Sequence, residues 1–595
     1  MCGIVGYTGE QPALPILLEA LKRLEYRGYD SAGVVVLDGQ LTLHKDKGEI
    51  RNLEDGLPDI PGSLGIGHTR WATHGAPSQP NAHPFVDCTG KLALAHNGII
   101  ENYRTHKDAL LGKGHKFTSE TDTEVVLHLV EDAYQGNLEE ALRAVLPRIE
   151  GAYAFALTHA DEPGKLVVAR RDSPLVLGLG AGENLFASDV PALLRTTSKV
   201  LYLMDGELAV LTPREVQIHA PDGSLVDRKP EVVTWNVEDA ERGGFAHFML
   251  KEIFEQPEVI HATLLGRLSD FENLEILRGA DRVQLVACGT SYHAALAGKY
   301  ILEEIAGIPA SAELASEYRY AARSDGKPLV VCISQSGETA DTIGAAREAK
   351  RRGSRTLAVT NYVDSSLTRE VEESLYTRAG LEIGVAATKT FTAQLVALYI
   401  LALRLGITRG TLTPDEARKW TEEIRALPRA VQSVVDAAPA IEGLAREYSH
   451  VRDMFFIGRN INFPMAMEGA LKMKEISYVH AEGYAAGELK HGPLALITGE
   501  TPVVALVPQD HTYEKMIGNI GEVSARGAPV VAIGYEGDEE LEKYVDAVLH
   551  VPWVRSIYSP VVNVVALQLL AYYTAREREC SIDKPRNLAK SVTVE

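Results

Sequence analysis

The chain has 595 residues, and its 60 basic and 81 acidic residues give a formal net charge of −21. A chain of this length exceeds what one hydrophobic core supports, so we expect about three or four domains. The composition, 45% hydrophobic and 24% charged, is that of a soluble globular protein, and without a basic cluster it excludes nucleic acid as a partner.

The chain starts MCGIVGYTGE, which lacks the basic segment and the continuous apolar stretch of a secretory signal. Initiator methionine is normally removed before a small residue, so we expect Cys2 to become the N-terminus, with its thiol and its α-amine on one carbon. The five cysteines, at positions 2, 88, 288, 332 and 580, are widely spaced without metal-ligand spacing. We therefore expect reduced thiols, a cytoplasmic protein and no metal, nucleotide or redox cofactor.

Residues 1–238 alternate short apolar runs with turn signals, and helical patterns cover 12–26 and 122–147. The runs typical of strands include AGVVVLD, LALAHNG, AYAFALTHA, KLVVARR and LAVLTP. Many strands with few helices favour a layered α+β domain. The polar, glycine-containing sequence that follows predicts a linker with a first helix over 239–268 and a hinge over 236–250.

Further along the chain, apolar strands and helical patterns alternate. RVQLVACGTS leads into YHAALAGKYILEEIAG, PLVVCISQSGET into ADTIGAAREAKRRG, and MFFIGRNINF into PMAMEGALKMKEIS. This order predicts α/β domains with parallel sheets covered on both faces, and its recurrence over 269–430 and 440–582 indicates one fold used twice. Residues 583–595 are predicted to form an extended tail.

Two apolar stretches, LVALYILAL and VVNVVALQLLAYY, are shorter than the roughly 20 residues that a membrane span requires. We therefore predict two core helices there and no association with a membrane.

Three short motifs in the first domain contain residues suited to catalysis. GHTRWATHG contains Arg70, AHNGIIENY contains Asn97 and Gly98, and SETDTE contains Asp122. Taken singly, Arg70 fits a surface ion pair and Asp122 a helix N-cap. The Asn-Gly pair alone fits a hairpin turn.

Together with Cys2, these motifs resemble the class II glutamine amidotransferases, whose layered αββα fold carries an N-terminal cysteine nucleophile. CGIVGY, RGYDSAG, HTRWATHG, HNGIIENY and SETDTE match that family in order. The resemblance implies that Cys2 attacks the carboxamide of glutamine, with its own α-amine as the base. It also implies that the side-chain amide of Asn97 and the N–H of Gly98 stabilise the oxyanion.

The same resemblance implies a set of glutamine-binding residues. Arg70 would hold the α-carboxylate bidentately, and Asp122 would pair with the α-ammonium group. Trp71 would act as a lid or channel residue, with a packed core tryptophan as the alternative. Thr73 and His74 complete the predicted set.

Two loops in the later part of the chain, CGTSYHA and SQSGETADT, each follow an apolar strand and open a helical pattern. A helix N-terminus favours phosphate, and the lack of a Walker A lysine favours a phosphate monoester over a nucleotide. Serine-rich N-capping is the alternative. The loops resemble the sugar isomerase (SIS) domain family. This resemblance implies the following sugar-phosphate-binding residues: Thr290, Ser291, Ser334, Gln335, Ser336, Thr339 and, on the tail, Ala589.

The segment MEGALKMKEISY places Glu468, Lys472 and Glu475 on one face of a helix. Such a face is commonly a solvated stripe of charges. Here apolar residues surround the stripe, which favours a partly buried and functional group.

The order of one amidotransferase domain, two SIS domains and the tail DKPRNLAKSVTVE resembles the glutamine–fructose-6-phosphate aminotransferase family. The resemblance implies that glutamine and fructose 6-phosphate become glutamate and glucosamine 6-phosphate, the first step of amino-sugar biosynthesis, with ammonia channelled from Cys2. Glu475 would move a proton between C1 and C2, and Lys472 would position the substrate. His491 would open the sugar ring across a homodimer interface, and Lys590 would form a Schiff base.

Two alternatives stay open. A class II amidotransferase with another acceptor would need a nucleotide or pyrophosphate site, for which the sequence has no loop. A sugar-phosphate sensor would not need Cys2 and would carry a helix-turn-helix segment or a basic face. The remaining histidines, including His115 and His128, are expected to be structural.

Overall fold

A computed structural model describes residues 2–58, 60–72, 74–233, 242–265, 275–321, 327–363 and 365–593. The chain divides into two compact units, Met1–Glu241 with Ala589–Glu595, and Arg242–Leu588. Parts of the predicted linker and hinge, residues 236–241 and 266–268, lie outside the described residues, as does Thr73.

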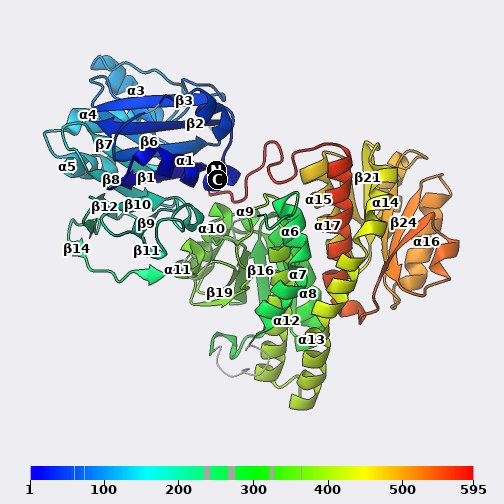
Figure 1. Ribbon diagram of the computed structural model, residues 1–595. Coiled ribbons are helices and arrows are strands. Elements are labelled where there is room, and N and C mark those ends of the chain that lie inside the picture. Colours follow the sequence, from blue (N-terminus) through cyan, green and yellow to red (C-terminus); the bar gives the residue numbers. More distant parts are fainter. Residues whose placement is uncertain are drawn as a thin grey trace. The chain divides into compact units, whose positions relative to one another are not determined.

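The first unit contains two antiparallel sheets (Figure 1). Its strands are β1 Gly3–Thr8, β2 Ser31–Asp38, β3 Gln40–Lys47, β4 Leu64–Arg70, β5 Phe85–Val86, β6 Leu92–Ile100, β7 Gly151–His159, β8 Leu166–Arg171, β9 Val176–Leu179, β10 Asn184–Ala187, β11 Lys199–Tyr202, β12 Leu208–Leu211, β13 Val216–His219, β14 Leu225–Val226 and β15 Glu231–Val232. Its helices are α1 Ala13–Leu24, α2 Ile50–Asp55, α3 Tyr103–Gly112, α4 Glu124–Ala133 and α5 Leu138–Val145. One sheet has the order β15-β11-β9-β10-β1-β4-β2-β3, and the other has the order β14-β13-β12-β8-β7-β6-β5.

Alternation along β1 assigns its side chains to two different layers. Ile4 packs between the two sheets with Ala95 of β6, whereas Val5 packs beneath α1 with Leu17. The far face of the second sheet packs against α4 and α5. The layers therefore run helix, sheet, sheet, helix, which confirms the predicted αββα arrangement.

The predicted helical pattern over 122–147 is two helices, α4 and α5, instead of one. Gly136 between them has a φ of 93°, a conformation that favours glycine. The side chain of Asn137 then accepts hydrogen bonds from the backbone N–H groups of Glu139 and Glu140, so it caps α5. A local turn with its own cap ends the first helix.

The second unit contains two five-stranded parallel sheets. Its strands are β16 Val283–Ala287, β17 Ala310–Leu314, β18 Leu329–Ser334, β19 Arg355–Thr360, β20 Glu373–Tyr376, β21 Asp453–Gly458, β22 His480–Ala485, β23 Val503–Val507, β24 Val530–Tyr535 and β25 Ala547–Val551. Its helices are α6 Phe248–Phe254, α7 Gln256–Leu264, α8 Gly289–Ala306, α9 Ala315–Tyr318, α10 Ala340–Arg351, α11 Ser366–Glu370, α12 Lys389–Arg409, α13 Pro414–Asp436, α14 Ala438–Tyr448, α15 Asn462–Ser477, α16 Tyr513–Ser524 and α17 Ser559–Glu577.

The two sheets of the second unit have equivalent strand orders, β17-β16-β18-β19-β20 and β22-β21-β23-β24-β25. In each sheet the second strand along the chain takes the edge and the first strand lies next to it. This repetition confirms that one α/β fold is used twice.

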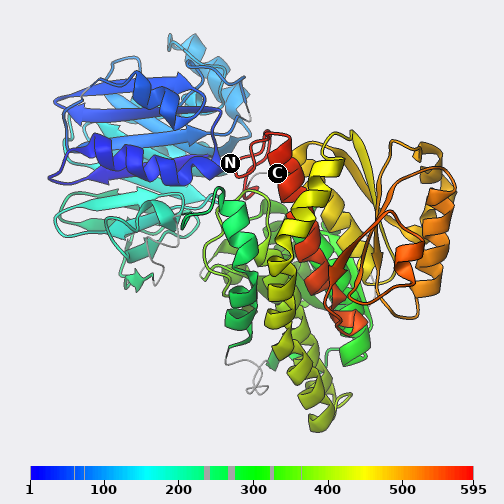
Figure 2. The same cartoon turned by 45° about the vertical axis from the view of Figure 1, so that its right-hand side comes forward.

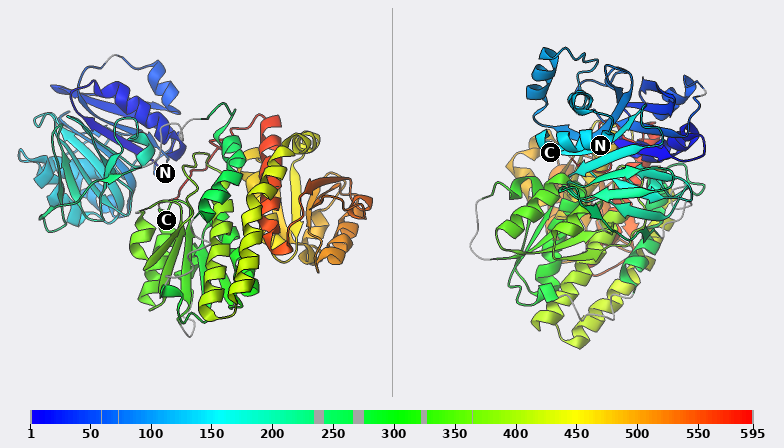
Figure 3. Two further views of the ribbon diagram at one scale, coloured as in Figure 1. Left: turned by 60° about the horizontal axis from the view of Figure 1, so that its bottom comes forward. Right: turned by 90° about the vertical axis from the view of Figure 1, so that its left-hand side faces the viewer.

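Helices from both halves of the second unit share one core between the sheets (Figures 1 and 2). One buried cluster contains Leu285 of β16, Leu398 of α12, Val504 of β23 and Leu567 of α17. Helix α10 packs on the other face of the first sheet, and α16 packs on the other face of the second (Figure 3). Both sheets are therefore covered on both faces, as predicted.

Helices α12 and α17 are the two described helices that are long and apolar enough to cross a membrane by length and composition. The expectation that these stretches are too short was wrong, since α12 alone has 21 residues. Within the second unit, 89% and 100% of their apolar windows are buried. Their apolar surface is covered by protein, so the prediction that both are core helices is confirmed.

We expect Leu398→Ala to lower the free energy of unfolding of the second unit by about 2–5 kcal/mol, because it leaves a cavity between α8 and α12. The two helices approach closely there, since a Cβ on Gly298 would lie 3.0 Å from Leu398 Cδ1. Urea denaturation measures the loss. The control Leu496→Ala removes a side chain of a residue that is 58% exposed and should change the value by less than about 0.5 kcal/mol. An equal loss of stability in the two variants would contradict the close packing of Leu398 between α8 and α12.

Candidate functional site

Cys2 directly precedes β1 and lies beside the end of β4. The backbone N–H of Trp71 donates to Cys2 Sγ at 3.3 Å, and Cys2 Sγ lies 3.5 Å from the carbonyl oxygen of Trp71. Burial raises the pKa of the Cys2 thiol, and the nearby Arg70 acts in the opposite direction. The thiol is thus held in one place in its protonated form, and it needs a base to become a nucleophile.

Asn97 and Gly98 lie within β6, opposite Ala154 and Tyr153 of β7, so the hairpin-turn interpretation was wrong. The side-chain amide of Asn97 donates from Nδ2 to the carbonyl oxygen of Cys2 at 3.0 Å. Because an amide nitrogen carries two hydrogens, one N–H of Asn97 remains for a further acceptor.

His68 orients the amide of Asn97. Its Nε2 lies 3.0 Å from Asn97 Oδ1 and 3.1 Å from the carbonyl oxygen of His96. Burial lowers the pKa of His68 to about 3, so the ring is neutral. Two acceptors at Nε2 then require the proton on that nitrogen, and His68 donates to the oxygen of the amide. This turns the nitrogen of Asn97 toward Cys2.

Gly98 has a backbone that other residues could not adopt at this position. Its φ is 133°, and a Cβ there would lie 2.0 Å from the carbonyl oxygen of Ala152. Only glycine fits without displacing β7.

Arg70 at the end of β4 is only 3% exposed, so the surface ion pair is excluded. Its Nη2 donates to the backbone carbonyl oxygens of His74 and Gly75, the latter at 3.0 Å. Its Nη1 has no hydrogen-bond partner within the described part of the chain. Burial lowers the pKa of the guanidinium group, and nearby acidic groups partly oppose that effect. The site therefore offers a buried cation with free donors.

Asp122 does not cap α4. Its Oδ2 accepts a hydrogen bond of 2.7 Å from the backbone N–H of Ile100, at the end of β6. Trp71 is partly exposed, and its ring meets that of Tyr29 edge to face at 6.3 Å, so it is not a fully packed core residue. The ring of His74 lies edge-on to that of Tyr103.

The two predicted phosphate loops lie at the carboxyl ends of adjacent parallel strands, β16 and β18, and open α8 and α10. No side chain among the described residues caps the first turn of either helix, so the N-capping alternative was wrong. The serine loop is held internally, since Ser334 Oγ lies 3.2 Å from Thr339 Oγ1 and accepts from the N–H of Gly337.

Other residues of the two loops have contacts of their own. Ser336 Oγ accepts from the backbone N–H of Glu338 at 3.1 Å. Gln335 uses its carbonyl oxygen to accept from the N–H of Asn361. Ser291 lies in the first turn of α8 and receives a hydrogen bond from the amide of Gln394 at 3.0 Å. The hydroxyl groups and uncapped N–H groups gather at one edge of the sheet.

Glu468, Lys472 and Glu475 of α15 form a buried cluster instead of a solvated stripe. Glu468 and Lys472 are both 0% exposed. Lys472 Nζ pairs with Glu475, lies 3.4 Å from Glu468 and donates to Thr290 Oγ1 at 3.1 Å. Glu468 also accepts from Thr290 and lies 2.6 Å from His293 Nδ1.

Charge pairing outweighs burial in this cluster. Burial acts to lower the pKa of Lys472, but Glu475 and Glu468 raise it above its usual value. Burial acts to raise the pKa of Glu468, but Lys472 and the hydrogen bond from His293 lower it. Lysine and glutamate are therefore both charged, and the loop residue Thr290 lies against them.

A pocket of about 460 Å³ opens beside this cluster within the second unit. Its walls include Gly289, Tyr292, His293, Met467, Leu471 and Tyr484. The pocket thus joins the first turn of α8 to α15 of the other SIS half.

Three predicted residues take no part in the ion pairs and hydrogen bonds described for this cluster. His491 ends the short 3-10 helix Ala486–His491 and is exposed. Ala589 and Lys590 are partly buried and belong to the first unit. The structure therefore leaves these three as predictions.

Sequence reasoning missed several residues that support the two sites. His68 and His293 lie inside motifs that were recognised, GHTRWATHG and CGTSYHA, but were not assigned a role. Glu338 ties the serine loop to α11 through the N–H and the hydroxyl of Ser366. Their partners are far away in the sequence, so only position within a known motif could have pointed to them.

Comparison with known proteins places these sites in a family. A glutamine amidotransferase domain matches residues 68–195, and an SIS domain matches residues 276–404 and 447–578. The C-terminal domain of glucosamine-fructose-6-phosphate aminotransferase from Francisella tularensis is 40% identical with a TM-score of 0.56, and the match covers 58% of this chain and 100% of that one.

Curated glutamine–fructose-6-phosphate aminotransferases [isomerizing] from Methanosarcina acetivorans and Thermus thermophilus are each 52% identical to this chain. Both alignments cover 100% of this chain and 100% of the relative. With this full-length similarity and both domain types present, the chain belongs to the family of glutamine–fructose-6-phosphate aminotransferases [isomerizing].

Proposed function

We propose that this chain transfers the amide nitrogen of glutamine to fructose 6-phosphate and isomerises the product to glucosamine 6-phosphate, with release of glutamate. The observation that carries the proposal is that one chain, similar to its family over its full length, combines the Cys2 site with a SIS site that contains a buried lysine. The enzyme would act in the cytoplasm as a homodimer.

In the first half-reaction, the α-amine exposed by removal of the initiator methionine accepts the thiol proton of Cys2, and the sulfur attacks the carboxamide carbon of glutamine. The oxyanion of the tetrahedral intermediate accepts hydrogen bonds from the second N–H of Asn97 and from the backbone N–H of Gly98. Collapse of the intermediate releases ammonia, and water then frees glutamate from the thioester. The hydrogen bond from His68 to Asn97 supports this assignment, because it fixes the amide with its nitrogen toward Cys2.

Glutamine itself is bound through its charged ends. The free Nη1 of Arg70 suits the α-carboxylate, and Asp122 suits the α-ammonium group. Trp71 and His74 would border this site, with Trp71 as the residue that covers the substrate. Thr73 keeps the role in glutamine binding that the family resemblance implies.

Fructose 6-phosphate is bound in the second unit through its phosphate. Hydroxyl groups and uncapped N–H groups at the starts of α8 and α10 suit an anion without help from a lysine. The hydroxyl groups belong to Thr290, Ser291, Ser334, Ser336 and Thr339, with Gln335 and Ala589 as further contacts.

In the second half-reaction, the amine of Lys590 condenses with the C2 ketone with loss of water, and ammonia displaces it to leave an imine at C2. Glu475 removes a proton from C1 and returns one to C2, which yields the C1 aldehyde and the C2 amine. Lys472 stays protonated and holds Glu475 in place. His491 of a second subunit opens the sugar ring beforehand.

Ammonia must pass from Cys2 to the sugar without entering bulk water. At neutral pH most free ammonia is ammonium, which is not a nucleophile, and a closed path keeps the reactive form. This requirement is the reason to propose a channel between the two sites.

Cys2→Ala should abolish synthesis of glucosamine 6-phosphate from glutamine and leave synthesis from ammonium salts intact, because only the source of ammonia is lost. Product formation from fructose 6-phosphate with each nitrogen source measures both activities. Cys580→Ser is the matched control, since it changes a thiol of the second unit to which no role is assigned. Retention of glutamine-dependent synthesis by Cys2→Ala would refute the role of Cys2.

Asn97→Ala should lower kcat for glutamine hydrolysis by about 100- to 1000-fold, since one donor to the oxyanion is lost. Glutamate release at saturating glutamine gives this value. The control Asn102→Ala removes an amide that binds Arg148 and Glu150 on the same unit and should retain kcat. A loss confined to KM would show that Asn97 only binds substrate.

Glu475→Gln should lower the rate of glucosamine 6-phosphate synthesis by about 100- to 10,000-fold with either nitrogen source, because the base is lost. Glutamine hydrolysis at Cys2 should persist. Glu447→Gln, an exposed change on α14, is the control. The same assay on the protein without any substitution tests the acceptor. If that protein hydrolyses glutamine but does not convert fructose 6-phosphate, the acceptor is a different phosphosugar.

A further inference from the structure

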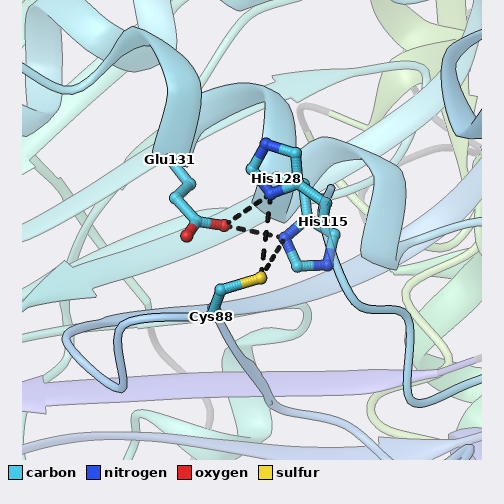
Figure 4. A group of neighbouring side chains, drawn as sticks. All are labelled: Cys88, His115, His128 and Glu131. Atoms are coloured by element: carbon cyan, nitrogen blue, oxygen red, sulfur yellow. Dashed lines mark hydrogen bonds and ion pairs between the residues drawn. The ribbon is translucent and has the colours of Figure 1, made fainter. Parts of the chain in front are cut away.

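A cluster of four potential metal ligands lies in the first unit, between the second sheet and α4 (Figure 4). Cys88 lies in the turn between β5 and β6, His115 follows α3, and His128 and Glu131 lie one turn apart on α4. Cys88 Sγ is 3.7 Å from His115 Nδ1 and 3.8 Å from His128 Nδ1. Glu131 Oε2 is 3.1 Å from His115 Nδ1 and 2.8 Å from His128 Nδ1.

We propose that Cys88, His115, His128 and Glu131 bind one Zn²⁺ ion. All four ligand atoms lie within 4.8 Å of one another. Bonds of about 2.0–2.3 Å in a tetrahedral zinc site place the ligand atoms roughly 3.3–3.8 Å apart, which is close to the spacing of this cluster. One thiolate, two imidazoles and one carboxylate are ligands that zinc prefers, whereas Mg²⁺ and Ca²⁺ prefer oxygen alone.

The second nitrogen of His115 is hydrogen-bonded to a carboxylate, as in many zinc sites. His115 Nε2 lies 2.9 Å from Asp132 Oδ1. His128 Nε2 lies 3.9 Å from Glu124 Oε1, and the side chain of His128 is only 1% exposed. An N–H at Nε2 of His115 would donate to Asp132 and leave a lone pair on Nδ1 directed into the cluster. Nε2 of His128 is buried and has no hydrogen-bond partner within the described part of the chain, so it too can carry the proton and leave Nδ1 for a metal.

Without a cation the same geometry is poorly satisfied. A neutral imidazole has one N–H, but His115 has an acceptor at each nitrogen, Glu131 at Nδ1 and Asp132 at Nε2. The same oxygen of Glu131 also lies at hydrogen-bond distance from Nδ1 of His128, so without a cation both Nδ1 atoms share one carboxylate oxygen. A Zn²⁺ ion at the Nδ1 atoms removes this conflict, and its charge balances the Cys88 thiolate and the Glu131 carboxylate.

The backbone N–H of Lys116 points to Cys88 Sγ at 3.5 Å, which suits a thiolate. Four protein ligands leave no open position, so the ion would be structural and not catalytic. It would join the β5–β6 turn and the segment after α3 to α4, the helix that begins just after Asp122. The spread of the ligands from residue 88 to residue 131 explains why cysteine spacing alone predicted no metal.

Metal content tests this proposal independently of activity. The full-length Cys2→Ala protein, which lacks the nucleophilic thiol, is loaded with Zn²⁺, freed of excess metal and analysed by mass spectrometry. We expect one equivalent of zinc per chain. Cys88→Ala in the same protein should lose it, and Cys580→Ala should keep it. Less than a tenth of an equivalent before the further substitution, or equal zinc in both variants, would overturn the proposal.

Cobalt substitution tests the ligand set without altering the cluster, so it remains decisive if Cys88→Ala fails to fold. Co²⁺ bound to the full-length Cys2→Ala protein should give a sulfur-to-cobalt charge-transfer band and intense visible bands of tetrahedral cobalt. A weak octahedral spectrum without the sulfur band would overturn the proposal.

Asp132→Asn should weaken zinc affinity by about 10- to 100-fold, since it loosens the hold on His115. The exposed Asp108→Asn on α3 is its control. Competition with a chromogenic chelator measures both values, and equal affinities would remove Asp132 as a positioning residue.

Discussion

The contact between the two SIS halves of the second unit depends on the ion pairs and hydrogen bond that satisfy the buried ammonium group of Lys472. Removing such an ion from water costs several kcal/mol, and this cost is offset only where charges and hydrogen bonds surround it. Glu468 and Glu475 supply the charges and Thr290 the oxygen, while His293 in turn binds Glu468. Because two of these residues belong to α8 and three to α15, the requirement to satisfy one lysine joins the two SIS halves at a defined register. The apolar core between the sheets supplies bulk stability, and the polar cluster specifies how the halves meet.

The site around Cys2 in the first unit is organised differently from the Lys472 cluster. Around Cys2, backbone groups and buried side chains from the ends of strands are held by hydrogen bonds, with few ion pairs among the described residues. A neutral His68 orients Asn97, and the close approach of β7 admits only glycine at position 98. Arg70 is buried, and its Nη1 has no hydrogen-bond partner within the described residues. In the proposed function, the α-carboxylate of glutamine would bind this nitrogen, beside groups that hydrogen bonds already hold in position.

The proposed zinc site fits this description of the first unit. Helix α4 begins two residues after Asp122, which is proposed to bind glutamine, and carries His128 and Glu131 further along its length. A cation there would hold α4 against the β5–β6 turn by bonds that do not depend on apolar area. The cluster lies on the helix-facing side of the second sheet, whereas Cys2 lies beside the other sheet. Stabilisation of the helix layer and catalysis would therefore use separate sets of residues within one domain.

Local pattern alone determined much of this protein. Short apolar runs predicted a layered α+β domain, and βα alternation predicted the duplicated parallel sheets. Ordered motifs such as CGIVGY and HTRWATHG indicated the family, and the resemblance to it implied the αββα layers. These signals all lie within short segments. Tertiary structure decided what depends on distant partners. It placed Asn97 and Gly98 inside a strand, divided the helical pattern over 122–147 at Gly136, and buried Glu468 with Lys472. It also placed the thiol of Cys88 next to the ring of His128, 40 residues further along the chain. Burial and pairing between residues far apart in the chain are properties of packing, and no local pattern of residues encodes them.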